Sequence, residues 1–364
     1  MKITRIETIA VSMPLLIKGA APLMSGKPRT SMEALYVRVD TDAGITGWGE
    51  AFGHRIWPAT KAAIDTLIGP ACIGCDASAI ATLMTQLQRT VHGAGRNGPA
   101  MHAMSGIDIA LWDIAGKAAN LPLHRLLGGS PRRDLPAYAS LLRYGKADAV
   151  GQNTAEARSR GYRHIKIHEI TVPEVKAARE AAGAGIPLMI DTNCPWSVRE
   201  AIAMTRAFQP YDPLWVEEPV WPPENVAGLA EVRRVTGTAI AAGENVGNTA
   251  DFKRLFDAGA VTYAQPSIIK VGGVTEIRKV IALAEAYGVE VVPHSPYFGP
   301  GLLASVHVLA ALPHETTVER FYCDFADNPL GERIDPLDGR IAVPQTPGLG
   351  ADPDPKLIEK LRIA

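Results

Sequence analysis

The chain has 364 residues, of which 47% are hydrophobic and 21% charged, and its formal net charge is −1. Because the charges are balanced and no long basic or acidic run occurs, nucleic acid and an anionic membrane are excluded as main partners. No apolar stretch approaches the roughly 20 residues of a membrane span, and the N-terminus alternates like a strand without a signal-peptide core. We therefore expect a cytoplasmic protein.

The first 60 residues are typical of β-structure. Residues 34–40 and 45–50 are strand-like and flank a turn at 41–44, which predicts a hairpin. From about residue 59 to residue 120 the apolar spacing becomes helical. Strands followed by a helical block predict a separate α+β module over residues 1–125. Its helical block contains a Cys72-x-x-Cys75 pair; with four cysteines in the chain we predict no disulfide framework and assign this pair no role.

Beyond residue 125, short apolar runs alternate with helical stretches. The predicted strands lie near 135–142, 162–168, 187–193, 213–218, 239–244, 262–267, 289–294 and 317–321. Helices are predicted between them, for example at 172–184, 198–208 and 274–287. Eight strand–helix units indicate an α/β barrel of the TIM type over residues 126–325 rather than an open sheet. In the last segment, 326–364, a glycine turn and strand at 338–344 are expected to return to the first module.

Polar residues close seven of the predicted strands. In chain order they are Lys166 with His168, Asp191 with Asn193, Glu217, Glu244, Ser267, His294 and Glu319. Successive separations from His168 are 23, 26, 27, 23, 27 and 25 residues, about one strand–helix unit each. The active sites of barrel enzymes lie at the C-terminal ends of the strands, so these side chains should converge on one mouth. Any one of them could be a solvated strand end, but seven in phase favour a shared site.

Three of these residues, Asp191, Glu217 and Glu244, each end an apolar run. Buried carboxylates brought together require a cation, and an all-oxygen ligand set suits a hard divalent ion. Lys166 and His168 lie two residues apart and therefore share one face of their strand. If Lys166 faced outward, the neighbouring isoleucines would lie inside the barrel instead. The three acidic residues at the ends of the following strands favour the other arrangement, in which Lys166 and His168 face inward.

These motifs together resemble the enolase superfamily, mandelate racemase subgroup (the mandelate racemase/muconate lactonizing enzyme family). The matching segments are Lys-x-His at 166–168, Trp-Val-Glu-Glu-Pro at 215–219, Ala-Gly-Glu-Asn at 242–245, Lys-Val-Gly-Gly at 270–273, Gly-Gly at 128–129 and Pro-Gly-Leu-Gly at 347–350. The resemblance implies an N-terminal α+β capping domain, completed by the C-terminal segment, over a modified (β/α)7β barrel. It also implies a small-molecule carboxylate substrate and a homo-oligomer, either a dimer or an octamer.

The resemblance further implies that Asp191, Glu217 and Glu244 bind Mg²⁺, and that the proton α to the substrate carboxylate is removed to give a metal-stabilised enediolate. Three carboxylates and Mg²⁺ sum to −1, and Lys166 returns the cluster to neutrality. The negative charge that builds on the substrate would face the metal, Lys166 and a protonated Glu319.

Two positions depart from the family pattern. His168 stands where the family commonly has a second lysine; with an ordinary pKa of ~6.5, an imidazole can act as a base at neutral pH. His294 is paired with Ser267, where the subgroup has an aspartate. A serine can orient an imidazole but cannot stabilise its charged form, so we expect His294 to be an acid or orienting donor rather than a strong second base.

Specificity should come from two capping loops, 16–30 and 51–58, and from residues beside the catalytic ones. Many loop residues make no contact with a ligand, yet binding residues are concentrated in loops. The substrate-binding candidates are Met24, Phe52, His54, Trp57, Asn193, Ser267 and Tyr297.

The sequence favours a Mg²⁺-dependent dehydratase of an acid sugar or other hydroxy-acid, with Lys166, His168, His294 and Glu319 as the catalytic residues. A base on one side of the substrate suits β-elimination better than two-base racemisation. The alternatives are a racemase, epimerase or cycloisomerase in which His294 exchanges a proton from the opposite face, and a non-catalytic barrel that binds a metal–carboxylate ligand.

Overall fold

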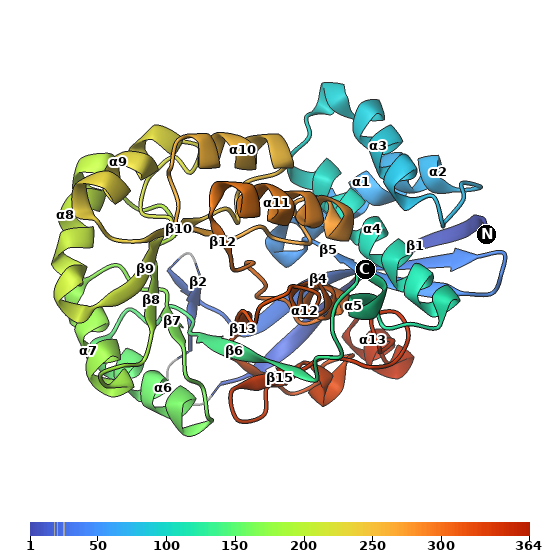
Figure 1. Cartoon of the computed structure of the whole chain (residues 1–364). Helices are drawn as coiled ribbons and strands as arrows, with labels where there is room; N and C mark the ends of the chain where they lie inside the picture. The colour runs from blue at the N-terminus through green and yellow to red at the C-terminus, as the bar shows by residue number, and fades with distance from the viewer. Residues whose placement is uncertain (18, 20, 25) are drawn as a thin grey trace.

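Two sheets organise the molecule, one in an N-terminal module and one in a barrel (Figure 1). The computed structural model describes residues 1–17, 19, 21–24 and 26–364. Lys18, Ala20 and Ser25, which belong to the predicted capping loop 16–30, lie outside the described residues. Among the described helices none is long and apolar enough to cross a membrane.

The N-terminal sheet has the strand order β14-β1-β4-β5. In it β1 (Ile3–Leu16) pairs antiparallel with β4 (Ser31–Thr41), which pairs antiparallel with β5 (Thr46–Ala51). The predicted hairpin is therefore confirmed. A small ribbon of β2 (Leu23–Met24) and β3 (Lys27–Pro28) forms within the first capping loop.

A helical block covers this sheet, as the sequence predicts. It comprises a 3-10 turn η1 (His54–Ile56), α1 (Trp57–Ala63), a π-helical stretch η2 (Ile64–Ile68), α2 (Gly69–Cys72), α3 (Ile80–Thr90), η3 (His92–Ala94) and α4 (Gly98–Ala119). The central helix α4 is buried along most of its length and begins with Asn97 as its N-cap. It ends at Asn120, whose left-handed conformation (φ 54°) stops the helix.

The helix α4 and the strand β5 approach unusually closely. Gly47 and Gly49 lie on one face of β5, and a Cβ atom added to Gly49 would be 1.9 Å from the Gly106 carbonyl oxygen. At Gly47 an added Cβ would be 2.2 Å from the Ala110 carbonyl oxygen. Glycine is therefore required on this face because the helix backbone occupies the space of a side chain.

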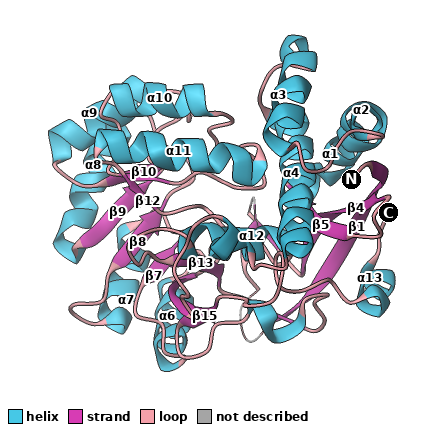
Figure 2. Ribbon diagram, turned by 45° about the vertical axis from the view of Figure 1, so that its right-hand side comes forward, coloured by secondary structure: helices cyan, strands magenta, loops and turns pink. Residues whose placement is uncertain are grey.

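Eight parallel strands and seven intervening helices build the barrel, with the helices outside (Figure 2). The strands are β6 (Asp134–Ser140), β7 (Ile165–Ile167), β8 (Leu188–Asp191), β9 (Pro213–Glu217), β10 (Ile240–Ala242), β11 (Tyr263–Ala264), β12 (Glu290–Val291) and β13 (Val318–Phe321). The helices are α6 (Ala147–Ser159), α7 (Val172–Ala182), α8 (Val198–Phe208), α9 (Val226–Thr236), α10 (Thr249–Asp257), α11 (Gly273–Tyr287) and α12 (Pro300–Ala310). The short helix α5 (Leu123–Leu126) and the turn η4 (Gln209–Tyr211) complete this part.

The predicted barrel and its eight strand positions are confirmed, and the alternation of seven helices with eight strands is the (β/α)7β arrangement. Several strands are shorter than predicted; β11, for example, covers two of the six residues expected. The missing residues lie beyond the last ladder hydrogen bonds, where the chain turns its polar side chains into the mouth. Below the mouth, Tyr138, Met189, Trp215, Ala241 and Val292 fill the barrel with a buried apolar layer.

The C-terminal segment contacts both sheets. The strand β14 (Asp324–Phe325) pairs with the end of β1, and α13 (Pro355–Leu361) packs against β1. The predicted strand at 338–344 exists as β15 (Arg340–Ala342), but its predicted partner is wrong: it pairs antiparallel with β6 of the barrel. A 3-10 turn, η5 (Gly331–Ile334), lies between β14 and β15. The division at residues 125 and 325 stays a prediction.

Candidate active site

The three predicted metal ligands meet at the mouth of the barrel. Asp191 and Glu217 end β8 and β9, and Glu244 lies two residues after β10. Each offers one carboxylate oxygen, and these oxygens all lie within 4.8 Å of one another. Asp191 and Glu217 are fully buried. Buried carboxylates this close repel one another unless a cation lies between them, so the donor set fits a hard divalent ion.

Lys166 is the cation that the protein itself supplies to this cluster. Its side chain is inaccessible to solvent, and its Nζ lies 3.3 Å from Asp191 Oδ2, 3.0 Å from Glu217 Oε1 and 2.8 Å from Glu319 Oε1. Burial alone would lower the pKa of Lys166, but the carboxylates of Glu217 and Glu319 outweigh it and raise this pKa well above its ordinary value. Lys166 therefore stays charged.

Glu319 closes β13 and is held from three directions. Besides Lys166, Ser140 Oγ donates to Oε1 at 2.7 Å and the Ser295 N–H donates to Oε2 at 2.9 Å. Burial would raise the pKa of Glu319, but Lys166 opposes it and the net shift is downward. The expectation of a protonated Glu319 is therefore wrong, because its oxygens face donors and a cation.

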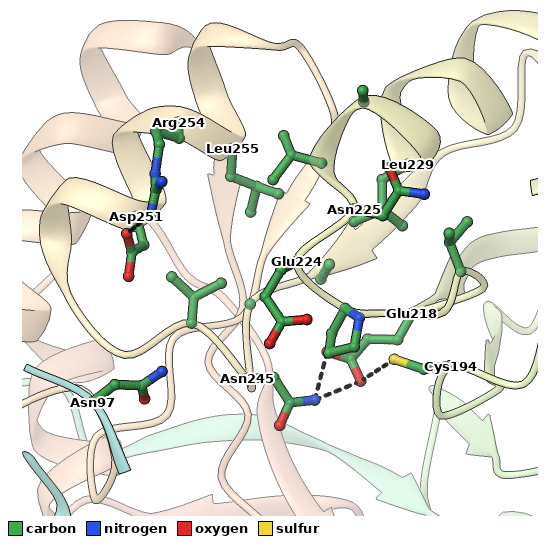
Figure 3. Close-up of a pocket in the computed structure, with 17 residues that line it drawn as sticks. Asn97, Cys194, Glu218, Glu224, Asn225, Leu229, Asn245, Asp251, Arg254 and Leu255 are labelled. Atoms are coloured by element: carbon green, nitrogen blue, oxygen red, sulfur yellow. Dashed lines mark hydrogen bonds and ion pairs between the residues drawn. The ribbon is translucent and has the colours of Figure 1, made fainter. Parts of the chain in front are cut away.

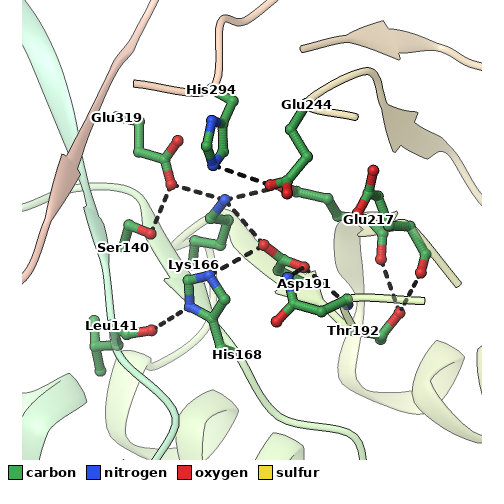
Figure 4. A network of polar contacts seen from close by, with 12 residues as sticks. Ser140, Leu141, Lys166, His168, Asp191, Thr192, Glu217, Glu244, His294 and Glu319 are labelled. Carbon is green, nitrogen blue, oxygen red and sulfur yellow. Dashed lines mark hydrogen bonds and ion pairs between the residues drawn. The ribbon is translucent and has the colours of Figure 1, made fainter. Parts of the chain in front are cut away.

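His168 and His294 lie on either side of the Lys166 ammonium (Figure 4). His168 Nε2 is 3.1 Å from Asp191 Oδ2, and its Nδ1 contacts the Leu141 carbonyl oxygen. Because a carbonyl oxygen can only accept a hydrogen bond, His168 Nδ1 carries a proton. A carboxylate oxygen also only accepts, so Nε2 donates to Asp191 Oδ2, and Nε2 is the nitrogen that can act as a base once it has released this proton.

His294 has a carboxylate beside one ring nitrogen and two hydroxyl groups beside the other. Its Nε2 is 3.0 Å from Glu244 Oε2, and its Nδ1 is 3.4 Å from Ser267 Oγ and 3.3 Å from Tyr297 Oη. Tyr297 Oη donates to the His294 carbonyl oxygen at 2.8 Å and also contacts Ser267 Oγ. Because a carboxylate oxygen only accepts, Nε2 donates to Glu244, whereas the two hydroxyl groups beside Nδ1 can donate or accept.

Neighbouring polar groups fix the carboxylates. Asn193 donates from its backbone N–H (3.1 Å) and from Nδ2 (2.8 Å) to Asp191 Oδ1. Trp215 Nε1 donates to Glu217 Oε2 at 3.0 Å, and Thr192 Oγ1 donates to the Glu217 carbonyl oxygen at 2.9 Å. Preset hydrogen bonds of this kind orient ligand oxygens before any cation arrives.

A cavity of about 390 Å³ opens above these residues. It is lined by Leu23, Met24, Arg29, Phe52, His54, Leu142, Arg143, His168, Asn193, Glu244, Lys270, His294, Pro296 and Phe321. Of the predicted substrate-binding residues, Met24, Phe52, His54 and Asn193 are brought together there.

Three predicted substrate-binding residues lie away from that lining. Trp57 begins α1 and packs against the core of the N-terminal module. Ser267 and Tyr297 are buried beside His294 Nδ1, so that their contact is with the imidazole. None of these three residues lines this cavity, and their contact with a substrate stays a prediction.

Besides Arg29 of the first capping loop, two cationic residues of the cavity lining were not among the candidates. Arg143 follows β6, and Lys270 lies in the turn before α11. Arg143 precedes His168 by 25 residues, which is within the range of 23 to 27 residues that separates the other polar strand ends. Extending that set by one strand toward the N-terminus would have found Arg143. Lys270 donates to Asn245 Oδ1 at 3.2 Å and lies 4.9 Å above the ring of Phe52.

A second cavity, of about 380 Å³, borders the acidic cluster (Figure 3). Glu218 lies in its wall and accepts hydrogen bonds from Asn245 Nδ2 at 3.0 and 2.9 Å. Burial, reinforced by the charges of Glu244 and Asp191, raises the pKa of Glu218 to about 8. This carboxyl group was not among the predicted site residues.

Two family models match the chain. The one described as mandelate racemase / muconate lactonizing enzyme, N-terminal domain, covers residues 13–128, and the one described as enolase C-terminal domain-like covers residues 149–357. Together they span both the capping module and the barrel.

Similar proteins include two curated enzymes. The chain is 33% identical to the 3,6-anhydro-alpha-L-galactonate cycloisomerase of Streptomyces coelicolor, over 91% of this chain and 92% of that enzyme. It is also 33% identical to the D-galactonate dehydratase of Ralstonia pickettii, over 89% and 90%. A solved structure of L-talarate dehydratase from Polaromonas sp. JS666, complexed with Mg and L-glucarate, matches with a TM-score of 0.86 at 31% identity, covering 100% of this chain and 98% of that one.

Proposed function

Because the chain belongs to the mandelate racemase/muconate lactonizing enzyme family of the enolase superfamily, we propose that it removes the proton α to the carboxylate of an acid sugar and then eliminates water. The observation that carries this proposal is the asymmetry of the two imidazoles. The Leu141 carbonyl oxygen keeps a proton on His168 Nδ1, so that Nε2 is its one nitrogen able to act as a base, whereas His294 donates from Nε2 to Glu244. Elimination needs one group that removes the α-proton and another that protonates the leaving hydroxyl, and the two imidazoles can fill these two roles.

The cofactor is Mg²⁺, and Asp191, Glu217 and Glu244 are the residues that would hold it. Bound there, it would supply a Lewis acid for the substrate carboxylate. Lys166 would add a fixed positive charge beside the same carboxylate, since its position is set by three ion pairs.

His168 would take the α-proton on Nε2, leaving the electron pair in an enediolate. In the second step that electron pair forms the double bond between the α- and β-carbons as the β-carbon–oxygen bond breaks. His294 would give its proton to the departing hydroxyl, so that water leaves. Before transfer this proton is on His294 Nε2, which lies 3.0 Å from Glu244 Oε2.

Cycloisomerisation is the second candidate, supported by the same proton on His294 Nε2. If an oxygen of the substrate itself is the leaving group, opening or closing a ring uses the same two proton transfers without loss of water. The similar S. coelicolor enzyme is named for such a reaction.

The decisive test is incubation of the protein with Mg²⁺ and a panel of acid sugars in D₂O. Dehydration predicts a 2-keto-3-deoxy acid and loss of water from the mass. His168→Asn should reduce α-proton removal by about 10²–10⁴-fold, while His294→Asn should keep α-proton exchange and lose product. His314→Asn, at an exposed histidine, is the matched control.

Recovery of substrate with deuterium at an inverted α-carbon would contradict dehydration and establish racemisation. Full activity of both His168→Asn and Glu217→Gln would contradict catalysis by this site and leave the binding barrel as the explanation.

A cytoplasmic location and a homo-oligomer, dimer or octamer, also stay predictions. Light scattering coupled to gel filtration measures the second directly.

A further inference from the structure

Arg143 is held rigidly in the cavity wall beside the proposed base. Its Nε donates to the His168 carbonyl oxygen at 2.7 Å, and its Nη2 donates to the Thr192 carbonyl oxygen at 3.3 Å. Two acceptors at different strand ends fix the plane of the guanidinium group. The backbone of Arg143 is bonded to the β2–β3 ribbon, because the Leu23 N–H donates to the Arg143 carbonyl oxygen at 2.8 Å.

Other cations around the cavity have anionic or polar partners. Lys166 faces three carboxylates, and Arg29 lies 3.8 Å from Glu33. Lys270 donates to Asn245. Over the described part of the chain, Arg143 has no carboxylate within 4.0 Å; its hydrogen bonds go to carbonyl oxygens.

Glu169, whose carboxylate feels the charge of Arg143, is not its ion-pair partner. Glu169 Oε1 accepts the backbone N–H groups of Tyr144 at 2.7 Å and Gly145 at 3.1 Å, and makes no ion pair with Arg143. A partly buried guanidinium with two of its five N–H groups occupied leaves three donors for a ligand. The planar arrangement of those donors matches a carboxylate, which is the ligand that guanidinium groups bind best in proteins.

The carboxylate that Arg143 would bind is distinct from the reacting one. The reacting carboxylate belongs at the Asp191, Glu217 and Glu244 cluster. His168 directs its imidazole to that cluster and its backbone carbonyl to Arg143. A substrate whose α-carbon meets the imidazole therefore continues past His168 toward the end of β6.

Arg29, the residue after the β2–β3 ribbon, adds a second guanidinium group to the cavity lining. The backbone N–H of Arg29 donates to the Pro22 carbonyl oxygen at 2.8 Å, and its side-chain Nη2 lies 3.2 Å from His54 Nδ1. The cavity lining thus carries three permanent cations, Arg29, Arg143 and Lys270, against one carboxylate, the proposed metal ligand Glu244.

Building on the proposed function, we propose that Arg143 binds a second carboxylate at the far end of the substrate, so that the preferred substrates are acid sugars with a carboxylate at both ends. Single-carboxylate sugars, which carry an uncharged hydroxymethyl group there, leave Arg143 unpaired and are poorer substrates. Arg143 is then a residue that selects the substrate, while His168 performs the proton transfer.

The test compares matched pairs of diacid and monoacid sugars: galactarate with D-galactonate, and D-glucarate with D-gluconate. Binding to the Mg²⁺-loaded protein is measured by calorimetry, and α-proton exchange is measured in D₂O. In the unmodified protein at least one diacid should bind about 10²-fold more tightly than its monoacid, the size expected for a charge-assisted bidentate contact.

Arg143→Gln should remove that preference by weakening diacid binding about 10²-fold, with monoacid binding changed less than about threefold; Arg143→Lys should be intermediate. Lys146→Gln, an exposed change of equal charge in the same loop, should leave the preference intact. Equal binding of diacid and monoacid, or equal weakening of both by Arg143→Gln, would overturn the proposal. Absence of α-proton exchange with every sugar would instead overturn the proposed function, since binding alone reports on Arg143.

Discussion

At the scale of single residues, the site depends on buried charges that each have a fixed partner. The sequence predicted the ligand triad and the inward direction of Lys166, because period-two alternation and strand ends are local properties. The ionisation of Glu319 could not be predicted, because it depends on Ser140 and on the backbone of Ser295, which only the closed barrel brings close.

Lys166→Met should destabilise the protein, most strongly without metal. The change leaves the carboxylates of Asp191, Glu217 and Glu319 buried without their cation, at an expected loss of about 3–5 kcal/mol. Denaturant titrations in EDTA and in Mg²⁺ measure it, and Mg²⁺ should restore more stability to this variant than to the unmodified protein. Lys176→Met, which removes an exposed ion pair, should change stability by under about 1 kcal/mol. Equal losses would contradict the prediction.

Glu50 gives the protein a pH dependence of known sign. Burial, partly offset by hydrogen bonds from the Gly301 and Gly299 N–H groups, raises its pKa from 4.5 to about 8. Between these values the folded state keeps a proton that the unfolded chain has lost, so the free energy of unfolding contributed by Glu50 falls as pH rises. Glu50→Gln should flatten this fall between pH 5 and 8 in denaturant titrations, whereas Glu359→Gln, at an exposed position, should not. An unchanged slope would contradict it.

At the scale of elements, the eight barrel strands were predicted within a few residues, because each is an apolar run bounded by helical or turn sequence. Their lengths were overestimated, since residues such as Ser267 and His294 continue the strand pattern after ladder pairing has ended. The partner of β15 was missed for another reason: alternation indicates a strand but not which free edge it joins, and here the edge is β6.

Gly49→Ala tests the contact between β5 and α4. The added methyl group would lie 1.9 Å from the Gly106 carbonyl oxygen, and the backbone on both sides must move to admit it. We expect a loss of about 2–3 kcal/mol in the free energy of unfolding, measured in urea. Gly93→Ala, where an added Cβ meets no atom within 4 Å, should cost less than about 0.5 kcal/mol. Similar values for the two would contradict this account of the interface.

At the scale of the whole molecule, the cavity is shared between the two modules. The barrel supplies His168, His294 and the acids, while the capping loops supply Met24, Arg29, Phe52 and His54. The sequence predicted this division of labour but not which loop residues reach the cavity, since Trp57 and His54 are three residues apart and only His54 lines it.

Removal of residues 355–364 should destabilise the capping module while leaving the acidic cluster in place. These residues bury Ile358 and Leu361, and the Ile363 N–H donates to the Ala10 carbonyl oxygen at 2.8 Å. Burial of two apolar side chains predicts a loss of about 3 kcal/mol or more and a lower Tm by calorimetry. Arg362→Ala, which removes only an ion pair with Glu7, should have a small effect. An unchanged Tm in the truncated chain would contradict the prediction.

The pairing of residues 363 and 364 with β1 has a consequence for the order of folding. Ala10 donates its N–H to the Ala364 carbonyl oxygen at 3.0 Å and accepts from the Ile363 N–H at 2.8 Å, so these hydrogen bonds join residues far apart in the sequence. Contacts between residues so distant form late in folding, because a long loop must close before they can be made. Until then this part of the β1 edge stays unpaired and open to association with other chains.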